Sequence, residues 1–180
     1  TRGYQPLLAV WAEQDLILSD EFRDGNVAGG EDPLTSVKRA FEMLPGWVEK
    51  RCFRGDSADY YAPLLKYLVV NDIIFTISAD MTKQLRARCV ALPDGEWQRM
   101  EVREREVVDV AEVEFTPGDW PKKASPLRYV AMRFTPTQTD IFEQPGVKYL
   151  SIVTNRPAKQ AGRKLVGDEM TAEEVVRWHW

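Results

Sequence analysis

The first 80 residues of the chain alternate between strand-like and helix-like hydrophobic patterns. Residues 4–11 and 16–22 are rich in apolar, β-prone side chains, and the polar residues 13–15 between them predict a tight turn that joins two strands. A third strand is predicted over residues 47–53. Residues 73–77 form a nearly continuous apolar run, which is typical of a strand covered on both faces, as in a parallel sheet.

Three helices are predicted in the same part of the chain. The first has Asp32 as its N-cap and Pro33 in its first position, and the second follows Ser57. Their apolar residues recur at the spacing of one helix face: Leu34, Val37, Phe41 and Leu44 in the first helix, and Tyr61, Leu64, Leu65 and Leu68 in the second. A short third helix is predicted over residues 81–92, with Asp80 as its N-cap. This succession predicts an α/β layer with crossover helices.

From residue 96 onward the chain alternates apolar with charged residues. The pattern covers residues 96–102, 107–115 and 127–134, and it predicts antiparallel strands that are exposed on one face. Residues 149–154 are again apolar, which predicts a buried strand that returns to the first layer.

The last part of the chain predicts a loop and then a helix. Residues 155–164 are polar and basic, which is typical of a surface loop. Thr171 and Glu174 have the spacing of a capping box, so a helix is expected to begin there. Because the chain starts at Thr1 without a Met and stops at Trp180 within this helix, we expect it to be an internal piece of a longer protein.

The composition and the net charge limit the classes of protein to which the chain can belong. The chain has 180 residues, 44% hydrophobic and 29% charged, which suits about one globular domain with a sizeable core. The net charge of −4 restricts any DNA-binding surface to a local patch. Cys52 and Cys89 have the spacing of neither a metal site nor a disulfide framework. Because the apolar runs are too short to span a bilayer and no signal peptide opens the chain, we expect a cytoplasmic protein with no membrane contact.

Few residue types in this chain can carry catalysis. His179 is the only histidine, and no glycine-rich phosphate-binding motif is present, so histidine-based metal sites, most catalytic triads and nucleotide cradles are unsupported. Carboxylates remain. Asp56 has the best position, where a predicted strand ends and a helix begins, although an Asp there also serves as a helix N-cap. Asp24 precedes Gly25 and is interpreted as a turn residue.

Two further groups of residues suggest contact with nucleic acid. Trp97 and Trp120 lie in the β-rich part and can stack on an unpaired base, although such residues more often pack in a core or a hairpin. Lys122, Lys123 and the basic stretch 156–164 can contact phosphate, and a solvated loop is the simpler explanation for both.

A series of short strings carries a family resemblance. The strings are Tyr4-Gln5-Pro6-Leu7, Trp11-Ala12-Glu13-Gln14, Glu21-Phe22-Arg23-Asp24-Gly25-Asn26-Val27, Leu44-Pro45, Val48-Glu49-Lys50, Arg54-Gly55-Asp56-Ser57, Val153-Thr154-Asn155-Arg156 and Arg177-Trp178-His179. In this order and spacing, they resemble the catalytic core of bacterial insertion-sequence transposases of the Asp-Asp-Glu (DDE) type.

The resemblance implies a ribonuclease H-like α/β fold, in which a mixed sheet has flanking helices plus a β-rich insertion. Residues 1–92 would be part of this core. Residues 93–146 would be the insertion, which related enzymes use to contact transposon-end DNA. Residues 147–180 would hold a return strand and the start of the final core helix. The expected partners are transposon-end and target DNA, and the full-length protein would be a homo-oligomer.

The resemblance also implies a chemistry. Such transposases cleave transposon ends and join them to target DNA, with three carboxylates that hold two Mg²⁺ or Mn²⁺ ions. Asp56 matches the second Asp of the family. The first Asp would precede Tyr4 and the Glu would follow Trp180, so we expect this chain to hold one of the three metal ligands and to be inactive alone. The alternatives are a non-catalytic DNA- or protein-binding remnant, and a metal-dependent nuclease on the same fold.

Overall fold

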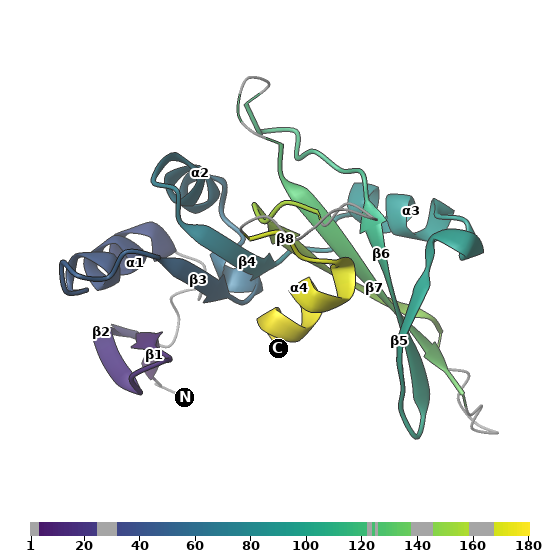
Figure 1. The fold of residues 1–180 in the computed structure, drawn as a ribbon, viewed down its shortest axis with the longest axis horizontal. Helices are drawn as coiled ribbons and strands as arrows, with labels where there is room; N and C mark the ends of the chain where they lie inside the picture. The colour runs from purple at the N-terminus through teal and green to yellow at the C-terminus, as the bar shows by residue number, and fades with distance from the viewer. Residues whose placement is uncertain (1–3, 25–31, 122–123, 125, 138–145, 159–167) are drawn as a thin grey trace.

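The computed structural model describes residues 4–24, 32–121, 124, 126–137, 146–158 and 168–180 (Figure 1). This part of the chain is a mixed α/β structure with two sheets. Its elements are β1 (Tyr4–Trp11), β2 (Leu16–Asp24), α1 (Pro33–Glu42), β3 (Cys52–Gly55), the 3₁₀ turn η1 (Ser57–Asp59), α2 (Ala62–Val70), β4 (Ile74–Ser78), α3 (Lys83–Ala91), the 3₁₀ turn η2 (Asp94–Glu96), β5 (Gln98–Val102), β6 (Glu106–Val113), β7 (Arg128–Pro136), β8 (Lys148–Thr154) and α4 (Ala172–His179). Among these described helices, none has the length and apolar character needed to span a bilayer.

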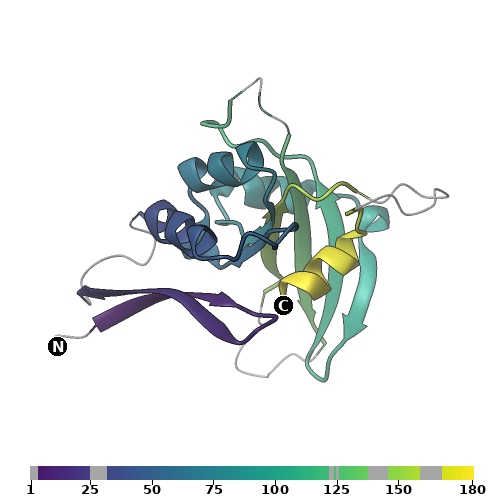
Figure 2. The same ribbon diagram turned by 60° about the vertical axis from the view of Figure 1, so that its left-hand side comes forward.

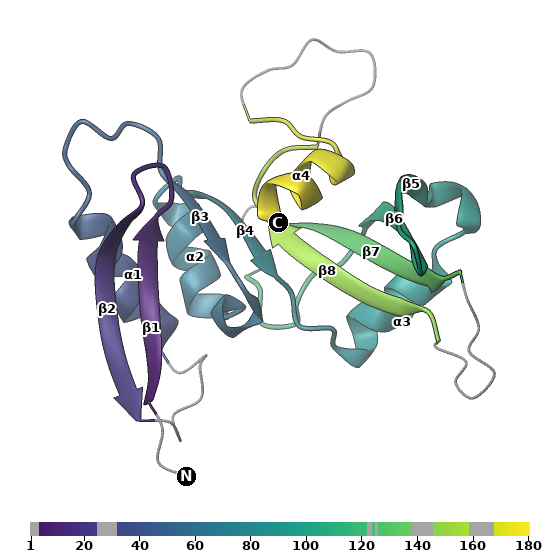
Figure 3. The ribbon, with the colours of Figure 1, turned by 90° about the horizontal axis from the view of Figure 1, so that it is seen from below.

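The larger sheet has six strands in the order β3-β4-β8-β7-β6-β5. β3 runs parallel to β4, with α2 as the crossover between them, whereas the other neighbouring strands are antiparallel. β8 pairs with both β4 and β7, which confirms that residues 149–154 return to the first layer. The strands after residue 96 therefore extend the same sheet that β3 and β4 begin (Figure 3).

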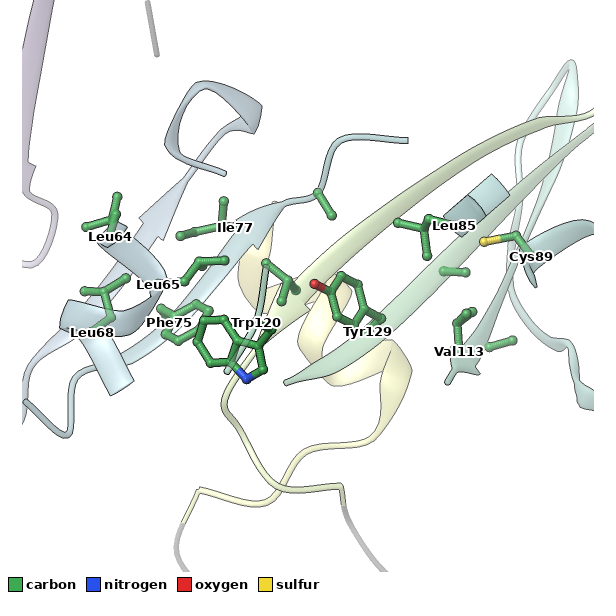
Figure 4. Close-up of a cluster of buried hydrophobic side chains, with 14 of the residues drawn as sticks. Leu64, Leu65, Leu68, Phe75, Ile77, Leu85, Cys89, Val113, Trp120 and Tyr129 are labelled. Carbon is green, nitrogen blue, oxygen red and sulfur yellow. The ribbon is translucent and has the colours of Figure 1, made fainter. Parts of the chain in front are cut away.

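Helices cover both faces of the central strands of this sheet. On one face, α2 and α3 pack with β4, β6 and β7 in a large apolar cluster that includes Leu68, Phe75 and Tyr129 (Figure 4). On the other face, α4 packs its apolar side against β6, β7 and β8. The prediction that the strands after residue 96 are half exposed is therefore wrong for β6 and β7, because both of their faces are covered.

The charged residues of these covered strands are paired. Asp109 on β6 is 4% exposed, and its carboxylate accepts hydrogen bonds from Arg99 at 2.6 Å and from Arg133 at 3.1 Å. A buried carboxylate needs such partners, because an isolated charge would carry a large desolvation cost. The alternation of apolar and charged residues thus reflects ion pairs across the sheet as well as exposure to solvent.

β1 and β2 form a separate antiparallel hairpin, joined by the predicted tight turn. The sequence pattern predicted a single layer, but among the described strands these two pair only with each other. α1 contacts one face of the hairpin (Figure 2). The other face exposes Leu8, Val10, Ile17 and Phe22. The hairpin is thus held to the rest of the molecule by helix packing, not by strand pairing.

β3 is shorter than predicted. It begins at Cys52 because its described partner is β4, and the pairing extends from Cys52 opposite Ile74 to Gly55 opposite Ile77. Trp47, in the part predicted as strand, is 70% exposed and lies against Trp11 of the hairpin, with 5.7 Å between ring centroids.

The helix caps are partly as predicted. The capping box of Thr171 and Glu174 is formed at the start of α4. The N-cap of α3 is Thr82 and not Asp80, because the Thr82 hydroxyl accepts a hydrogen bond from Leu85 N at 3.2 Å. Asp32 does precede α1, but its backbone is left-handed, with φ of 48°, and its side chain accepts a hydrogen bond from the Thr35 hydroxyl at 2.8 Å and not the backbone bond of an N-cap.

Candidate functional site

The parallel pair β3 and β4 brings two chain segments to one edge of the large sheet. Because parallel strands end at the same edge, the residues after Gly55 and after Ser78 lie next to one another. β3 is also the last strand of the sheet, so within the described part its outer side is unpaired. Asp56 is the first residue after β3, as predicted, and it is exposed. Figure 3 shows this edge at the arrowheads of β3 and β4.

Asp56 caps the turn η1. Its Oδ1 accepts a hydrogen bond from the backbone N–H of Ala58 at 2.8 Å. The N-cap interpretation of this residue is therefore confirmed. A carboxylate has several acceptor positions, so this one bond leaves the exposed group able to bind a further cation or donor.

A second carboxylate, Asp59, packs against Gly55 at the end of β3. A Cβ atom at position 55 would lie 2.8 Å from Asp59 Cβ and 2.9 Å from its Cγ, closer than such atoms approach in proteins. Only glycine leaves this space for the Asp59 side chain. The Gly in Arg54-Gly55-Asp56 is thus explained by close packing of the turn against the strand.

Asp59 loses its proton at a higher pH than an ordinary Asp. Burial, and then the nearby Asp56 carboxylate, raise the pKa of Asp59 from 3.8 to about 6. Asp59 was not among the site residues predicted from the sequence. The signal was the spacing of Asp56 and Asp59 across one short turn, but nothing in the sequence shows that the turn buries the second side chain.

Two more carboxylates act on Tyr60, the residue that follows the turn. Burial raises the pKa of Tyr60, and the negative charges of Asp119 and Asp80 add to that rise. Tyr60 directly follows Asp59, and its hydroxyl is 2.9 Å from the hydroxyl of Tyr129. Asp119 and Asp80 therefore lie close enough to act on the residue that follows this turn.

The C-terminal end of α4 is fastened to the same two strands. His179 Nδ1 is 2.8 Å from the hydroxyl of Thr76, and its Nε2 is 3.0 Å from the hydroxyl of Ser78, both on β4. Arg54, on β3, donates a hydrogen bond from Nη1 to the carbonyl oxygen of Trp178 at 3.2 Å. The end of α4 and the Asp56 turn are thus linked through Arg54.

The environment of His179 favours its neutral form. Burial lowers the pKa of His179 below 6.5, and the positive charge of Arg54 lowers it further. A neutral imidazole has one N–H donor and one acceptor nitrogen, and the two hydroxyls can satisfy both. His179 therefore acts as a bridge between α4 and β4.

The expected two-metal site requires more ligands than this part of the chain brings together. Within the residues that the structure describes, no group of three or more His, Cys, Asp or Glu side chains could hold a metal ion. Asp56 and Asp59 are two neighbouring carboxylates at this edge. Mg²⁺ is commonly bound by one or two carboxylates with water and substrate phosphate, so the exposed Asp56 suits one ligand position and not a complete site.

The predicted aromatic sites are in the core. Trp97 is 9% exposed and Trp120 is 6% exposed, so neither presents a face on which a base could stack. The Arg133 guanidinium covers the Trp97 ring, 4.7 Å from its centroid. Asp24 ends β2, and Lys122 and Lys123 lie outside the described residues.

Arg156 is not a solvated loop residue. It is 4% exposed, and its guanidinium stacks over the Trp178 ring at 4.5 Å and pairs with Asp168 at 3.5 Å. This contact ties the end of β8 to α4. Residues 159–167 of the basic stretch lie outside the described part.

Comparison with known proteins assigns no family, because no protein-family model and no curated protein matches the chain. The resemblance to DDE transposases therefore depends on the short sequence strings.

Proposed function

We propose that this chain is part of the catalytic core of a DNA transposase of the DDE type, which cleaves transposon ends and joins them to target DNA. The observation that carries the proposal is the position of Asp56. It is an exposed carboxylate at the carboxyl end of the edge strand of a mixed α/β sheet, next to the carboxylate of Asp59. This is where sites of α/β sheets are usually built.

The arrangement of the two sheets supports a ribonuclease H-like core. In the family, the strand with the first Asp directly precedes the segment that matches β1. Here β3 has an unpaired outer edge, and the hairpin strand nearer to it is β1 (Figure 3). A strand placed between β1 and β3 would join the hairpin to the large sheet. It would also bring its own carboxylate beside Asp56.

Asp56 is the residue that we propose as a ligand of Mg²⁺ or Mn²⁺. When bound, closely spaced metal ions activate the attacking water or 3′-hydroxyl and stabilise the leaving oxygen at phosphorus. The residues of this chain have supporting tasks. Gly55 lets the turn pack closely, Ala58 N–H orients the Asp56 carboxylate, and Arg54 connects the site to α4. With only this part of the ligand set, the chain is expected to be inactive alone.

A metal titration tests the role of Asp56. We expect Mn²⁺ or Mg²⁺ to raise the melting temperature of the wild type and to have no such effect on Asp56→Asn. Asn is as good an N-cap as Asp, so the variant keeps the η1 cap. At a metal concentration ten times the Kd, the stabilisation is about 1.4 kcal/mol, or a shift of about 3–5 °C for a chain of this size.

The control for this titration is Asp20→Asn, at an exposed carboxylate on the hairpin. It should respond to metal as the wild type does. If Asp56→Asn also responds like the wild type, Asp56 is no metal ligand in this chain. The second candidate function is then favoured, a non-catalytic DNA- or protein-binding remnant of the same fold. The lack of a three-ligand group among the described residues points to it.

A further inference from the structure

The solvent side of α3 carries three basic side chains. Its nine residues include Lys83, Arg86 and Arg88 and no acidic residue. All three basic side chains are exposed, whereas Leu85 and Cys89 are buried against the large sheet. The helix is thus fixed by its apolar side and turns its positive charges toward solvent.

These charges are not neutralised within the described part of the chain. None of the three side chains forms an ion pair with a described carboxylate, whereas Arg128 pairs with Glu112 and Arg133 pairs with Asp94 and Asp109. In a chain with a net charge of −4, an unpaired basic surface is the local patch that binding of DNA requires.

Arg86 and Arg88 each have a neighbouring side chain that affects how much they are expected to contribute to DNA binding. The Arg86 guanidinium lies over the ring of Tyr149, 5.9 Å from its centroid, which restrains the side chain without using its N–H donors. Arg88 and Glu114 line the same surface depression, so the field of Arg88 is partly offset. We therefore expect Lys83 and Arg86 to contribute more than Arg88.

The position of α3 relates this face to Asp56. α3 follows directly after β4, whose carboxyl end lies at the same sheet edge as Asp56 (Figure 3). From Lys83 to Arg88 the helix advances about 7.5 Å. Around the helix axis, Arg86 and Arg88 are about 160° apart, on the sides of Tyr149 and Glu114, and Lys83 lies between them on the exposed side.

We propose that the exposed face of α3 binds the phosphate backbone of duplex DNA. This inference rests on the proposed function. It names the surface that would hold the DNA on which a chain with its site at Asp56 acts. A protein partner fits the face less well, since its one large exposed apolar side chain is Val90. Protein interfaces usually have an apolar centre. DNA binding here would depend strongly on salt and little on sequence.

The test measures duplex DNA binding by fluorescence anisotropy over a range of salt concentrations. In the α3 variant, Lys83→Gln, Arg86→Gln and Arg88→Gln are combined. In the control, the combined changes Lys38→Gln, Arg39→Gln and Lys66→Gln on α1 and α2 remove the same charge near the hairpin end of the molecule (Figure 1). We expect the α3 variant to bind about tenfold more weakly at low salt. Its slope of log K against log salt should be smaller by about 2–3. Circular dichroism checks that both variants fold.

The possible outcomes separate this inference from the proposed function. If the wild type binds DNA and the α3 variant keeps the same salt slope, the α3 inference is wrong and the transposase proposal is unaffected. If both variants lose affinity equally, only overall charge matters and the α3 surface is again excluded. If the wild type binds no duplex DNA at any salt concentration, both proposals fail for this chain.

Discussion

At the scale of single residues, Asp59 shows how a fold can change the chemistry of a side chain. An Asp three residues after another Asp, in a polar segment, would be expected to be ionised. Packing against Gly55 removes water from its carboxylate, and the Asp56 charge opposes a second negative charge. Asp59 therefore keeps its proton up to about pH 6.

From the raised pKa of Asp59 we predict how the free energy of unfolding depends on pH. A carboxyl group that binds its proton more tightly in the folded state contributes stability below its unfolded pKa of 3.8, and that contribution is lost as the pH rises through about 6. Asp59→Asn should therefore be more stable than the wild type above pH 7, by up to about 3 kcal/mol, and equally stable near pH 3.5. Urea unfolding from pH 3.5 to 8 measures this difference. An unchanged difference between variant and wild type across that range would contradict it.

At the scale of secondary-structure elements, α4 combines local and tertiary determinants. Its capping box is a local signal, and its apolar face packs on β6, β7 and β8. Its C-terminal end is held by polar contacts of His179 and the Trp178 carbonyl with β4 and β3. These contacts set the end of the helix against the strands that lead to Asp56.

His179 should make the docking of α4 sensitive to acid. Because its folded-state pKa is lowered below 6.5, its contribution to stability is complete above pH 6.5 and is lost as the pH falls below that value. His179→Ala should cost about 1–3 kcal/mol at pH 7.5, for two lost hydrogen bonds, and less at pH 5. Hydrogen exchange of the α4 amides should accelerate in this variant before that of β7.

A second variant separates titration from packing. Asp59 titrates in an overlapping pH range with the opposite effect, so each variant is compared with the wild type at the same pH. His179→Gln retains a donor and an acceptor but has no titrating group. Its stability relative to wild type should rise as the pH falls from 7 to 5. A constant difference would show that His179 is not held neutral.

At the scale of the whole molecule, the two sheets differ in how they are stabilised. The central strands of the six-stranded sheet are covered on both faces by helices, whereas the hairpin contacts α1 on one face and exposes apolar side chains on the other. A two-stranded sheet is marginally stable by itself. The hairpin is thus the part that is least protected against local opening.

This difference predicts separate opening of the hairpin. Native-state hydrogen exchange should show the β1 and β2 amides exchanging at least about a hundredfold faster than those of β7 and β8, which corresponds to about 3 kcal/mol. The amides of Val130 and Ile152, in the middle of the large sheet, serve as the internal reference. Exchange of both sheets at the same free energy would mean that the hairpin opens only with the whole molecule.

Most elements of the large sheet were predictable from local sequence. The apolar run that contains Phe75 and Ile77 did become a strand buried on both faces, and Leu64, Leu65 and Leu68 did become the buried side of α2. Asp56 was found because a strand end followed by a helix start is visible in the sequence. Its role as a metal ligand stays a prediction, as does the domain division at residues 92 and 146.

By itself, the sequence determined the kind and order of the elements, because hydrophobic period and caps act over a few residues. Only the tertiary structure decided the pairing of β8 between β4 and β7, the burial of Asp59 and Arg156, and the separation of the hairpin from the large sheet. These features depend on contacts between residues far apart in the chain, or on space left by a neighbour. No local pattern encodes the desolvation and strand pairing that result.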